Sequence, residues 1–427
     1  MIQAIVCQRR FWLVILLALI LRCGCAIAVQ RYVAQNPGRL CLISGDAEGY
    51  WELAGKLAAG QEYSIYEPPR RLLRMPGFPL VLAIPRALFG DNPFAARMLL
   101  AVIGTVACGL TYWLGAELAG ETVATLAGLY TAVSPLMVLF SVLFLSEMAF
   151  AAAMLASLAV LAHLVRRLAE SSPSGSLSGF ALQAGVLIGV ATYMRPTWLL
   201  VGPGVGLLIM LFGPQTLVMR TRLAALICVG VAVTLAPWTI RNYQITHHVI
   251  PTTLWVGPSL YDGLNPSANG DSDMTFFEDD KLLHVMSEYE MDQEYRRRAW
   301  SFARENPQKT LWLALQKQIR YWSPSPNSVQ FRAAAFHLVA WASYLPLLLF
   351  SLVGFYAARR DFWLLILTTA PILYFAALHL LFVGSLRYRL PAEFPLAVLA
   401  AVGIVYCWSG SSGSAAAVTS PPLVKSP

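Results

Sequence analysis

The chain has 427 residues, 57% of them hydrophobic and only 13% charged, and its mean hydropathy is +0.59. A soluble globular protein has roughly 25% charged residues, so the composition excludes that class and predicts a polytopic membrane protein. The net charge is +8, but the basic residues occur as short pairs between apolar segments. This distribution is typical of topology signals, so we expect contacts with membrane lipids and none with nucleic acid.

The N-terminal segment has a pattern that is consistent with two interpretations. Arg9-Arg10 precede an apolar run over 11–21, and small residues follow up to Ala28. This pattern is typical of a cleaved signal peptide and also of a retained first membrane span. Cleavage stays open, and either alternative places the residues that follow outside the cytoplasm.

Ten segments are apolar over the length that a bilayer requires, about 20 residues. They lie at approximately 11–29, 94–115, 121–140, 146–165, 179–194, 197–213, 222–240, 336–357, 362–383 and 390–408. Ten spans with a cytoplasmic N-terminus place four arginine pairs inside, as the positive-inside bias predicts. These residues are Arg9-Arg10, Arg166-Arg167, Arg220 with Arg222, and Arg359-Arg360. The predicted fold class is an all-α bundle of about ten transmembrane helices, with no visible internal repeat.

The first long segment outside the membrane is the loop at about 30–93. Apolar residues recur at helical spacing over 46–59, and a second apolar stretch covers 76–89. Both are predicted to be helices that lie in the membrane interface rather than crossing it.

The second outer segment, 242–335, begins with turn-rich sequence. It becomes helical over 291–304 and again from Pro307, which follows the predicted capping residue Asn306. This segment is too small and too polar to be an independent soluble enzyme, so we expect it to cap the bundle. The chain is thus divided into an N-terminal transmembrane module 1–241, the loop 242–335, C-terminal transmembrane helices 336–409 and a flexible tail 410–427.

Possible metal ligands give little support for a metal site, and no cofactor is predicted. Seven cysteines show neither metal spacing nor a disulfide framework and are interpreted as buried apolar side chains: Cys7, Cys23, Cys25, Cys41, Cys108, Cys228 and Cys407. A carboxylate patch in the second outer segment is interpreted as a solvated loop face: Asp271, Asp273, Glu278, Asp279 and Asp280. Three glycines inside a span, at 202, 204 and 206, favour helix packing over a phosphate-binding loop.

Asp46 opens the run Asp46-Ala47-Glu48-Gly49-Tyr50-Trp51 in the first outer loop. Two carboxylates this close together, just outside a bilayer, are suited to general-base catalysis. The alternatives are a solvated loop or a helix N-terminus, because Asp is a good N-cap residue and acidic residues suit the first turn. Capping and catalysis are compatible, since a capping contact also fixes the position of a carboxylate.

Glu147 and four arginines also fall on the outer side. Glu147 begins an otherwise uncharged span, where an ionisable residue faces either a cavity or the interface. Arg74, Arg195, Arg387 and Arg389 lie there against the positive-inside bias. A guanidinium binds phosphate through two parallel hydrogen bonds, although any one arginine could instead extend to lipid headgroups. Four arginines on the same side as three carboxylates favour a phosphate site.

These motifs occur in a familiar order. They are Asp46-Ala-Glu48-Gly-Tyr50, Arg74-Met-Pro76-Gly-Phe-Pro79, Ser146-Glu147, Arg195-Pro196, Ala236-Pro-Trp-Thr-Ile-Arg-Asn-Tyr243 and Arg387-Tyr388-Arg389-Leu390-Pro391. With them, the chain resembles the GT-C transferases of polyprenyl-phosphate sugars. The resemblance is to bacterial relatives of the dolichyl-phosphate-mannose protein mannosyltransferases (glycosyltransferase family 39, which includes aminoarabinose transferases of lipid A), and it covers nearly the whole chain.

The resemblance implies a reaction on the outer side of the cytoplasmic membrane. A sugar would move from a lipid-linked phosphate to a hydroxyl or phosphate of a glycan, lipid or protein acceptor, in this family usually with inversion at the anomeric carbon. The implied site has a general base at Asp46, supporting carboxylates at Glu48 and Glu147, donor phosphate contacts from Arg74, Arg195, Arg387 and Arg389, and cavity walls from Tyr50 and Tyr388.

The chain departs from the family pattern in two ways. Ala47 separates Asp46 from Glu48, whereas the family often has adjacent Asp and Glu, so either carboxylate is open as the base. The chain also has no β-trefoil insert, so it gives no support for a protein acceptor. Family members generally act without a metal, and metal dependence stays open here.

Two other function classes stay open. A transporter or flippase of lipid-linked sugar would place polar residues at mid-span and often contain inverted repeats, neither of which is visible. A structural assembly subunit would tolerate changes at both Asp46 and Arg389.

Overall fold

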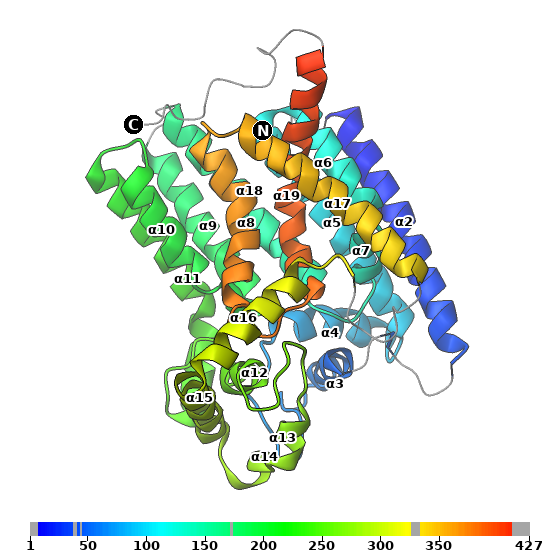
Figure 1. The fold of residues 1–427 in the computed structure, drawn as a ribbon, viewed down its shortest axis with the longest axis vertical. Coiled ribbons are helices and arrows are strands. Elements are labelled where there is room, and N and C mark those ends of the chain that lie inside the picture. The colour runs from blue at the N-terminus through cyan, green and yellow to red at the C-terminus, as the bar shows by residue number, and fades with distance from the viewer. Residues whose placement is uncertain (1–6, 37–40, 43–44, 171–173, 326–333, 412–427) are drawn as a thin grey trace.

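The computed structural model describes residues 7–36, 41–42, 45–170, 174–325 and 334–411. It consists of a bundle of long helices with a smaller helical cap at one end (Figure 1). The bundle contains α2 (Arg9–Ala34), α5 (Pro93–Ala119), α6 (Glu121–Val133), α7 (Pro135–Phe140), α8 (Glu147–Ala169), α9 (Ser174–Met194), η1 (Pro196–Trp198), α10 (Val201–Phe212), α11 (Leu217–Thr246), α17 (Ala334–Ala357), α18 (Phe362–Leu378) and α19 (Leu386–Ser411). The cap contains α3 (Asp46–Ala58), α4 (Gly77–Phe89), α12 (Val256–Gly263), α13 (Thr275–Asp279), α14 (Leu282–Val285), α15 (Glu288–Glu305) and α16 (Pro307–Trp322).

Seven helices in the described part of the chain are long and apolar enough to cross a membrane. They coincide with seven of the ten predicted spans. The other three predicted spans are helical but shorter or broken: 121–140 forms α6 and α7, 197–213 forms η1 and α10, and 362–383 forms α18. The chain is therefore a multi-pass membrane protein.

One predicted span is wrong as a continuous helix, because it breaks between α6 and α7. Pro135 has no N–H to donate, and Ser134 has a non-helical ψ of 117°. The carbonyl oxygens of Thr131 and Ala132 accept hydrogen bonds from the buried Arg22 guanidinium of α2, at 2.9 and 3.2 Å. Arg22 thus pairs with carbonyl groups at the end of α6 that water cannot reach in an apolar bundle.

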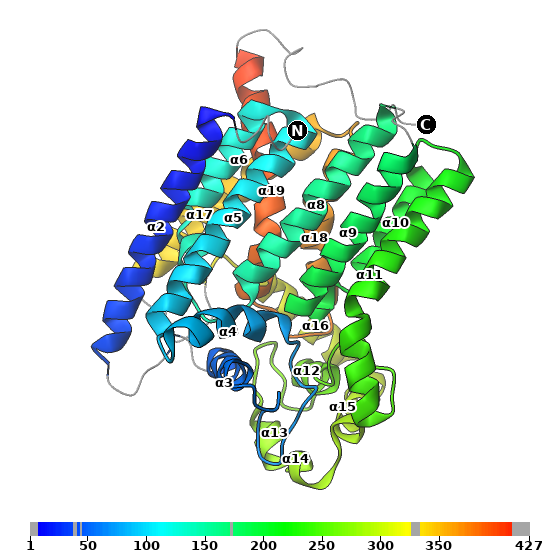
Figure 2. The ribbon, with the colours of Figure 1, turned by 180° about the vertical axis from the view of Figure 1, so that it is seen from behind.

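The centre of the bundle is formed by α8 and α19. In their most apolar windows 78% of the residues are buried, against 28% in α2 and α17, which are therefore the helices exposed to lipid. Figures 1 and 2 show α19 in the middle of the bundle from both sides. The cap ends of α8 and α19 consequently form the floor beneath the cap.

The arginine pairs lie at the opposite end of the bundle from the cap. Arg9 begins α2, Arg166 and Arg167 lie in the last turn of α8, Arg220 and Arg222 lie near the start of α11, and Arg359 and Arg360 connect α17 to α18. Figure 1 shows these helix ends on the side away from α12–α16. This separation agrees with the predicted topology, in which the cap is outside and the arginine pairs are inside.

The helices predicted in the two outer segments are confirmed as α3, α4, α15 and α16. Asn306 is at the N-cap position of α16, but its amide donates to the Phe302 carbonyl and does not cap the helix. The preceding helix, α15, does have a side-chain cap: Ser287 accepts a hydrogen bond from the N–H of Glu290 at 3.3 Å. The predicted domain boundary at residue 241 lies inside α11, which continues to Thr246.

One face of α16 holds the end of α18 and the turn after it. Tyr321 donates its hydroxyl to the Ile372 carbonyl at 2.8 Å, and Gln318 donates its amide to the Ala376 carbonyl at 2.7 Å. Lys317, which is fully buried, donates Nζ to the Leu381 carbonyl at 2.6 Å. These contacts fix the turn that leads into α19.

The buried Lys317 makes stability depend on pH in a definite direction. Burial lowers the pKa of Lys317 to about 8, and the nearby Asp262 only partly opposes this. The unfolded chain, with a lysine pKa of about 10.4, binds more protons between these values, so the free energy of unfolding should rise from about pH 8 to about pH 10. In thermal unfolding, Lys317→Met should remove this rise, and Lys281→Met at an exposed lysine should keep it. A pH-independent difference between wild type and Lys317→Met would contradict the prediction.

Candidate functional site

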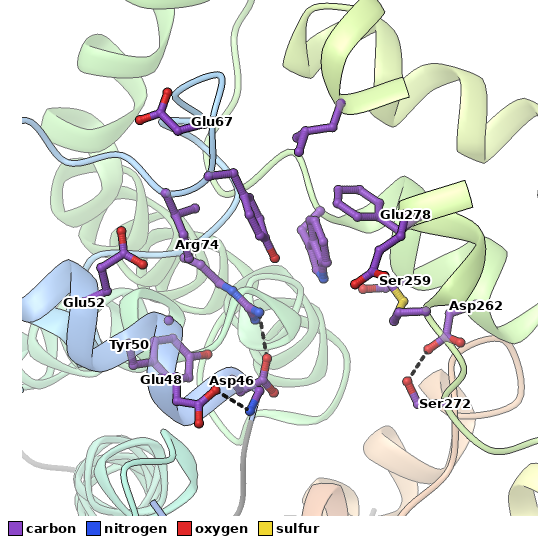
Figure 3. Close-up of a pocket in the computed structure, with 18 of the residues that line it drawn as sticks. Asp46, Glu48, Tyr50, Glu52, Glu67, Arg74, Ser259, Asp262, Ser272 and Glu278 are labelled. Carbon is purple, nitrogen blue, oxygen red and sulfur yellow. Dashed lines mark hydrogen bonds and ion pairs between the residues drawn. The ribbon is translucent and has the colours of Figure 1, made fainter. Parts of the chain in front are cut away.

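A cavity of about 1010 Å³ lies where the cap meets the bundle (Figure 3). Its walls come from α3, from the segment between α3 and α4, from the segment between α11 and α15, and from the cap end of α19. Seven of the nine site residues predicted from the sequence line it: Asp46, Glu48, Tyr50, Arg74, Arg195, Arg387 and Tyr388. Glu147 contacts two of these from below, and Arg389 lies elsewhere.

Asp46 is held between two arginines at the floor of the cavity. Its Oδ1 lies 2.7 Å from Nη2 of Arg74, and its Oδ2 lies 2.9 Å from Nη1 of Arg387. Figure 3 shows Arg74 extending from the segment after α3 down to the Asp46 carboxylate. The ion pair between Asp46 and Arg387 joins the first residue of α3 to the start of α19, two segments that are far apart in the sequence.

Glu147 continues this ion-pair cluster into the bundle. Its Oε1 contacts both Nε of Arg387 and Nη2 of Arg195, the latter at 3.2 Å. The Glu147 side chain is fully buried, and its Oε2 makes no hydrogen bond. Together with Asp46 and Arg74, the cluster has three guanidiniums against two carboxylates, so it has one excess positive charge facing the cavity.

The surroundings of Asp46 keep it ionised. Burial would raise the pKa of Asp46, but the guanidiniums of Arg74 and Arg387 outweigh this effect and hold the pKa well below its ordinary range. The alternative of a helix N-terminus is confirmed, because Asp46 and Glu48 are acidic residues in the first turn of α3, although the N-cap position itself is occupied by Gly45. Glu48 makes the backbone contact instead, accepting from the N–H of Gly45 at 3.4 Å.

Aromatic rings cover the arginines of the cluster. The Arg74 guanidinium lies 5.4 Å from the ring centroids of both Tyr50 and Trp255. Arg195 lies 5.3 Å from the Tyr388 ring, which stacks on the buried His379 with centroids 4.6 Å apart. The rings exclude water from one side of each guanidinium and so favour binding of an anion from the cavity.

Arg389 is not part of this site. It is fully buried, its Nε lies 2.7 Å from Oε1 of Glu393, and its Nη1 donates to the carbonyls of Tyr321 and Ser323. Its guanidinium also lies 3.6 Å from the centroid of the Tyr344 ring. Its hydrogen bonds hold α16 to α19, and Arg389 does not line the cavity in which the phosphate contact was expected.

Aromatic side chains that were not predicted as site residues cover the outer part of the cavity. Tyr66, Trp255 and Phe277 lie together there, with Trp255 and Phe277 ring centroids 5.1 Å apart. Tyr66 has a φ of 70°, which is uncommon for a bulky residue, and its ring is exposed. The one available signal was aromatic residues in segments predicted to lie outside the membrane.

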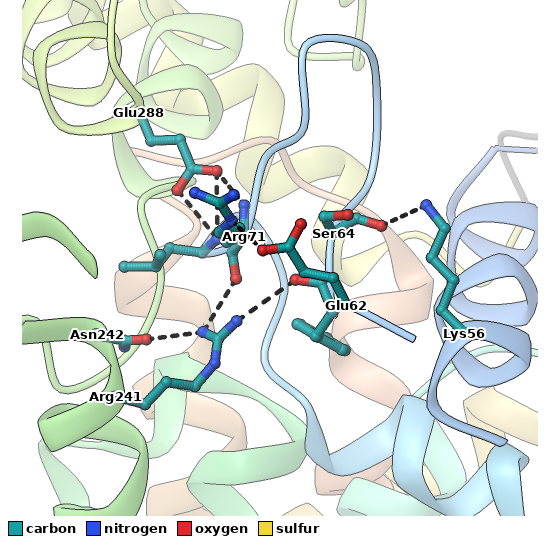
Figure 4. A network of polar contacts seen from close by, with 9 residues as sticks. Lys56, Glu62, Ser64, Arg71, Arg241, Asn242 and Glu288 are labelled. Atoms are coloured by element: carbon teal, nitrogen blue, oxygen red, sulfur yellow. Dashed lines mark hydrogen bonds and ion pairs between the residues drawn. The ribbon is translucent and has the colours of Figure 1, made fainter. Parts of the chain in front are cut away.

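The backbone before Arg74 is held by side chains from α11 and α15 (Figure 4). Glu288 accepts from the N–H groups of Arg71 and Leu72, the latter at 3.1 Å, and Arg241 donates to the Arg71 carbonyl at 3.3 Å. Because residues 71–74 form no regular structure, these contacts replace the hydrogen bonds that a helix or strand would provide. The second outer segment therefore positions an arginine that belongs to the first.

Three residues of the acidic patch in the second outer segment make local contacts, and a fourth, Glu278, lines the cavity. Asp271 pairs with Arg320 at 2.8 Å, Asp280 pairs with Arg298 at 2.7 Å, and Asp273 accepts from the Thr275 N–H at 3.1 Å. Within the described part of the chain, no three His, Cys, Asp or Glu side chains are grouped as a metal site would require.

Comparison with known proteins tests the resemblance. Residues 71–240 match the sequence model of the dolichyl-phosphate-mannose-protein mannosyltransferase family. The predicted resemblance is confirmed. The matched region contains Arg74, Glu147 and Arg195, and it leaves Asp46 and Arg387 outside. No curated protein sequence matches the chain.

Solved structures of glycosyltransferases share the fold. The archaeal oligosaccharyltransferase AglB from Archaeoglobus fulgidus, in complex with an inhibitory peptide and a dolichol-phosphate, has a TM-score of 0.58 at 13% identity, over 94% of this chain and 51% of that one. The apo form of the Archaeoglobus fulgidus enzyme gives the same TM-score and coverage at 12% identity. This likeness confirms the predicted GT-C fold class, and the chain spans about half the length of these structures.

A third structure is matched over more of its own length, but with a lower TM-score. ArnT from Cupriavidus metallidurans, bound to undecaprenyl phosphate, is 16% identical over 95% of this chain and 80% of that chain, with a TM-score of 0.42.

Glu288 can be tested as the residue that holds the segment before Arg74. Glu288→Ala leaves the N–H groups of Arg71 and Leu72 without a partner, which should cost about 1–3 kcal/mol per buried group and lower the melting temperature. Glu62→Ala, which removes only an exposed ion pair to Arg71, is the matched control and should change the melting temperature little. Equal melting temperatures for the two variants would contradict the role of Glu288.

Proposed function

We propose that the protein is a membrane glycosyltransferase that moves a sugar from a polyprenyl-phosphate-linked donor to an acceptor outside the cytoplasmic membrane. The observation that carries the proposal is the cluster of Asp46, Arg74 and Arg387 at the floor of the cavity. It combines a carboxylate that can take a proton with guanidiniums that can bind a phosphate, at the end of the membrane bundle. The family match over residues 71–240 supports the same class of enzyme.

In the proposed reaction Asp46 is the general base. It accepts the proton of an acceptor O–H while the acceptor oxygen forms a bond to the anomeric carbon. The bond from that carbon to the phosphate oxygen breaks, and the phosphate leaves with the electron pair. Arg74 and Arg387 stabilise the negative charge that develops on the leaving group.

A single displacement of this kind inverts the anomeric carbon. Retention needs a second carboxylate that attacks this carbon as a nucleophile. Glu147 is a poor candidate, because it is fully buried and paired with Arg195 and Arg387. Of the two carboxylates in the first turn of α3, we assign the base to Asp46, since Glu48 is the one that accepts from the Gly45 backbone.

The outer part of the cavity is proposed to bind the acceptor. Its aromatic rings offer apolar faces, and Glu67 and Glu278 can accept hydrogen bonds from hydroxyl groups. These carboxylates, together with Asp262, would repel additional negative charge, so a hydroxyl-bearing acceptor fits better than an anionic one. Glycans, lipids and proteins all offer such hydroxyls.

The alternative function is a transporter or flippase of lipid-linked sugar. Transporters typically place their binding site near the middle of the membrane. The charges of this cavity lie instead where the bundle meets the cap, which favours the enzyme. Movement of a lipid-linked sugar across vesicles by the purified protein, without transfer to any acceptor, would reverse this preference.

Asp46→Asn tests the general base. With membranes and a labelled lipid-linked sugar, the variant should transfer sugar roughly 100- to 10,000-fold more slowly, because a positioned base contributes about that much. Asp91→Asn is the matched control, since Asp91 is exposed and pairs with Arg86 outside the cavity. Transfer at the wild-type rate by Asp46→Asn, at a normal protein level, would exclude Asp46 as the base.

Arg387 and Arg389 form a second matched pair. Arg387→Gln removes a proposed phosphate contact, so kcat/KM for the donor should fall about 10- to 100-fold. Arg389→Gln leaves Glu393 buried without its partner, so the protein should lose about 3–5 kcal/mol of stability while the folded fraction keeps its donor KM. The opposite result, with donor KM raised only in Arg389→Gln, would move the phosphate site away from the cavity.

A further inference from the structure

The arrangement of the ion pairs raises a question about the proposed base. Asp46 lies within 2.9 Å of two guanidiniums, and a carboxylate held this way has little affinity for a proton. A general base works best when its pKa lies nearer the working pH. The site without donor is therefore in a state that disfavours the reaction.

The two arginines that hold Asp46 are also the proposed partners of the donor phosphate. The side chains of Arg74 and Arg387 are each 19% exposed, so an anion in the cavity can reach them. A phosphate between them would compete directly with the Asp46 carboxylate for the same Nη atoms. The excess positive charge of the cluster favours this competition, since one added negative charge brings it to neutrality.

Arg387 can change partner without leaving its position. Its Nε contacts Glu147 and its Nη1 contacts Asp46, so the two carboxylates use different atoms of one guanidinium. Glu147 is fully buried and also paired with Arg195. The Nε contact can thus persist while Nη1 moves from Asp46 to a phosphate oxygen.

We propose, on the basis of the function proposed above, that Arg74 and Arg387 lock Asp46 as an unreactive carboxylate and that the donor phosphate releases it. Asp46 gains its affinity for a proton only when the lipid-linked phosphate occupies the arginines. Donor binding therefore precedes deprotonation of the acceptor. Arg387 is a positioning residue for Asp46 as well as a phosphate contact.

The ion pairs of Asp46 with Arg74 and Arg387 also account for release of the product at the end of the catalytic cycle. The donor is a phosphodiester with one negative charge, whereas the product polyprenyl phosphate is a monoester with about −1.5 to −2 at neutral pH. The product consequently binds the arginines more strongly than the donor does. Once Asp46 gives its proton to water, it competes for the same guanidiniums and assists release of the product lipid.

The test measures Asp46 directly and requires no acceptor. The full-length protein is labelled with carbon-13 at the aspartate side-chain carboxyl carbon, and the Asp46 signal is assigned by its loss in Asp46→Asn or, independently, in Asp46→Glu. The fraction of protonated Asp46 is then followed by NMR from pH 2 to 8 without lipid, where the carboxylate should stay ionised over nearly the whole range, with undecaprenyl phosphate, and with undecaprenol, which lacks the phosphate. The phosphate lipid should raise the midpoint by about 1–3 pH units, since loss of a neighbouring opposite charge changes a pKa by that amount, and undecaprenol should leave it unchanged.

Two variants show whether the shift of the Asp46 midpoint depends on the ion pair with Arg387 or is a general effect of added lipid. Arg387→Gln should raise the Asp46 midpoint without any lipid and reduce the further rise that undecaprenyl phosphate causes. Arg71→Gln, at an exposed arginine paired with Glu62, should behave as wild type. A midpoint that undecaprenyl phosphate leaves unchanged or lowers overturns the lock.

The measurement also distinguishes this inference from the proposed function. If Asp46→Asn abolishes sugar transfer but the lipid does not move the midpoint, the base stands and the lock is wrong. If the lipid raises the midpoint but Asp46→Asn transfers sugar normally, the lock stands and the assignment of the base is wrong.

Discussion

The rest of the site depends on Arg387, a single guanidinium that bridges two carboxylates from different helices. Asp46 is the first residue of α3, and Glu147 is the first residue of α8, where helix dipoles favour negative charge. Arg387 lies at the start of α19, where the same effect disfavours a cation. The two ion pairs offset that cost, and they join the cap to the two central helices of the bundle.

Such a cluster is poorly explained as a device for stability. Burying charges costs free energy that their mutual attraction recovers only in part, and apolar side chains of similar volume often stabilise a protein as well or better. Here the cluster also has an excess positive charge and a carboxylate oxygen, Oε2 of Glu147, with no hydrogen bond. The excess positive charge, rather than the unpaired carboxylate oxygen, is what is expected at a site that binds a further anion.

The cap contributes more than a cover over the bundle. Its second segment holds the backbone before Arg74 through Glu288, together with Arg241 of the bundle helix α11, and it supplies Trp255 against the Arg74 guanidinium. A segment too small to fold as a separate enzyme thus gives the first outer segment a defined geometry. The two outer segments and the bundle form one site because Asp46 of the first segment pairs with Arg387 of the bundle, and Glu288 of the second segment accepts from the backbone of the first.

The sequence by itself determined the membrane class, most of the long helices and seven of the residues that line the cavity. Composition, helical periodicity and charge asymmetry are local properties, so they can be read from the sequence without knowledge of the fold. They could not separate Arg387 from Arg389, because both have the same charge and lie in the same motif. Residues two apart on a helix point in nearly opposite directions, and the packing of α19 decided that Arg387 faces the cavity while Arg389 faces Tyr344. Only the tertiary structure could bring Asp46 to Arg387, since no local pattern links segments so distant in the chain.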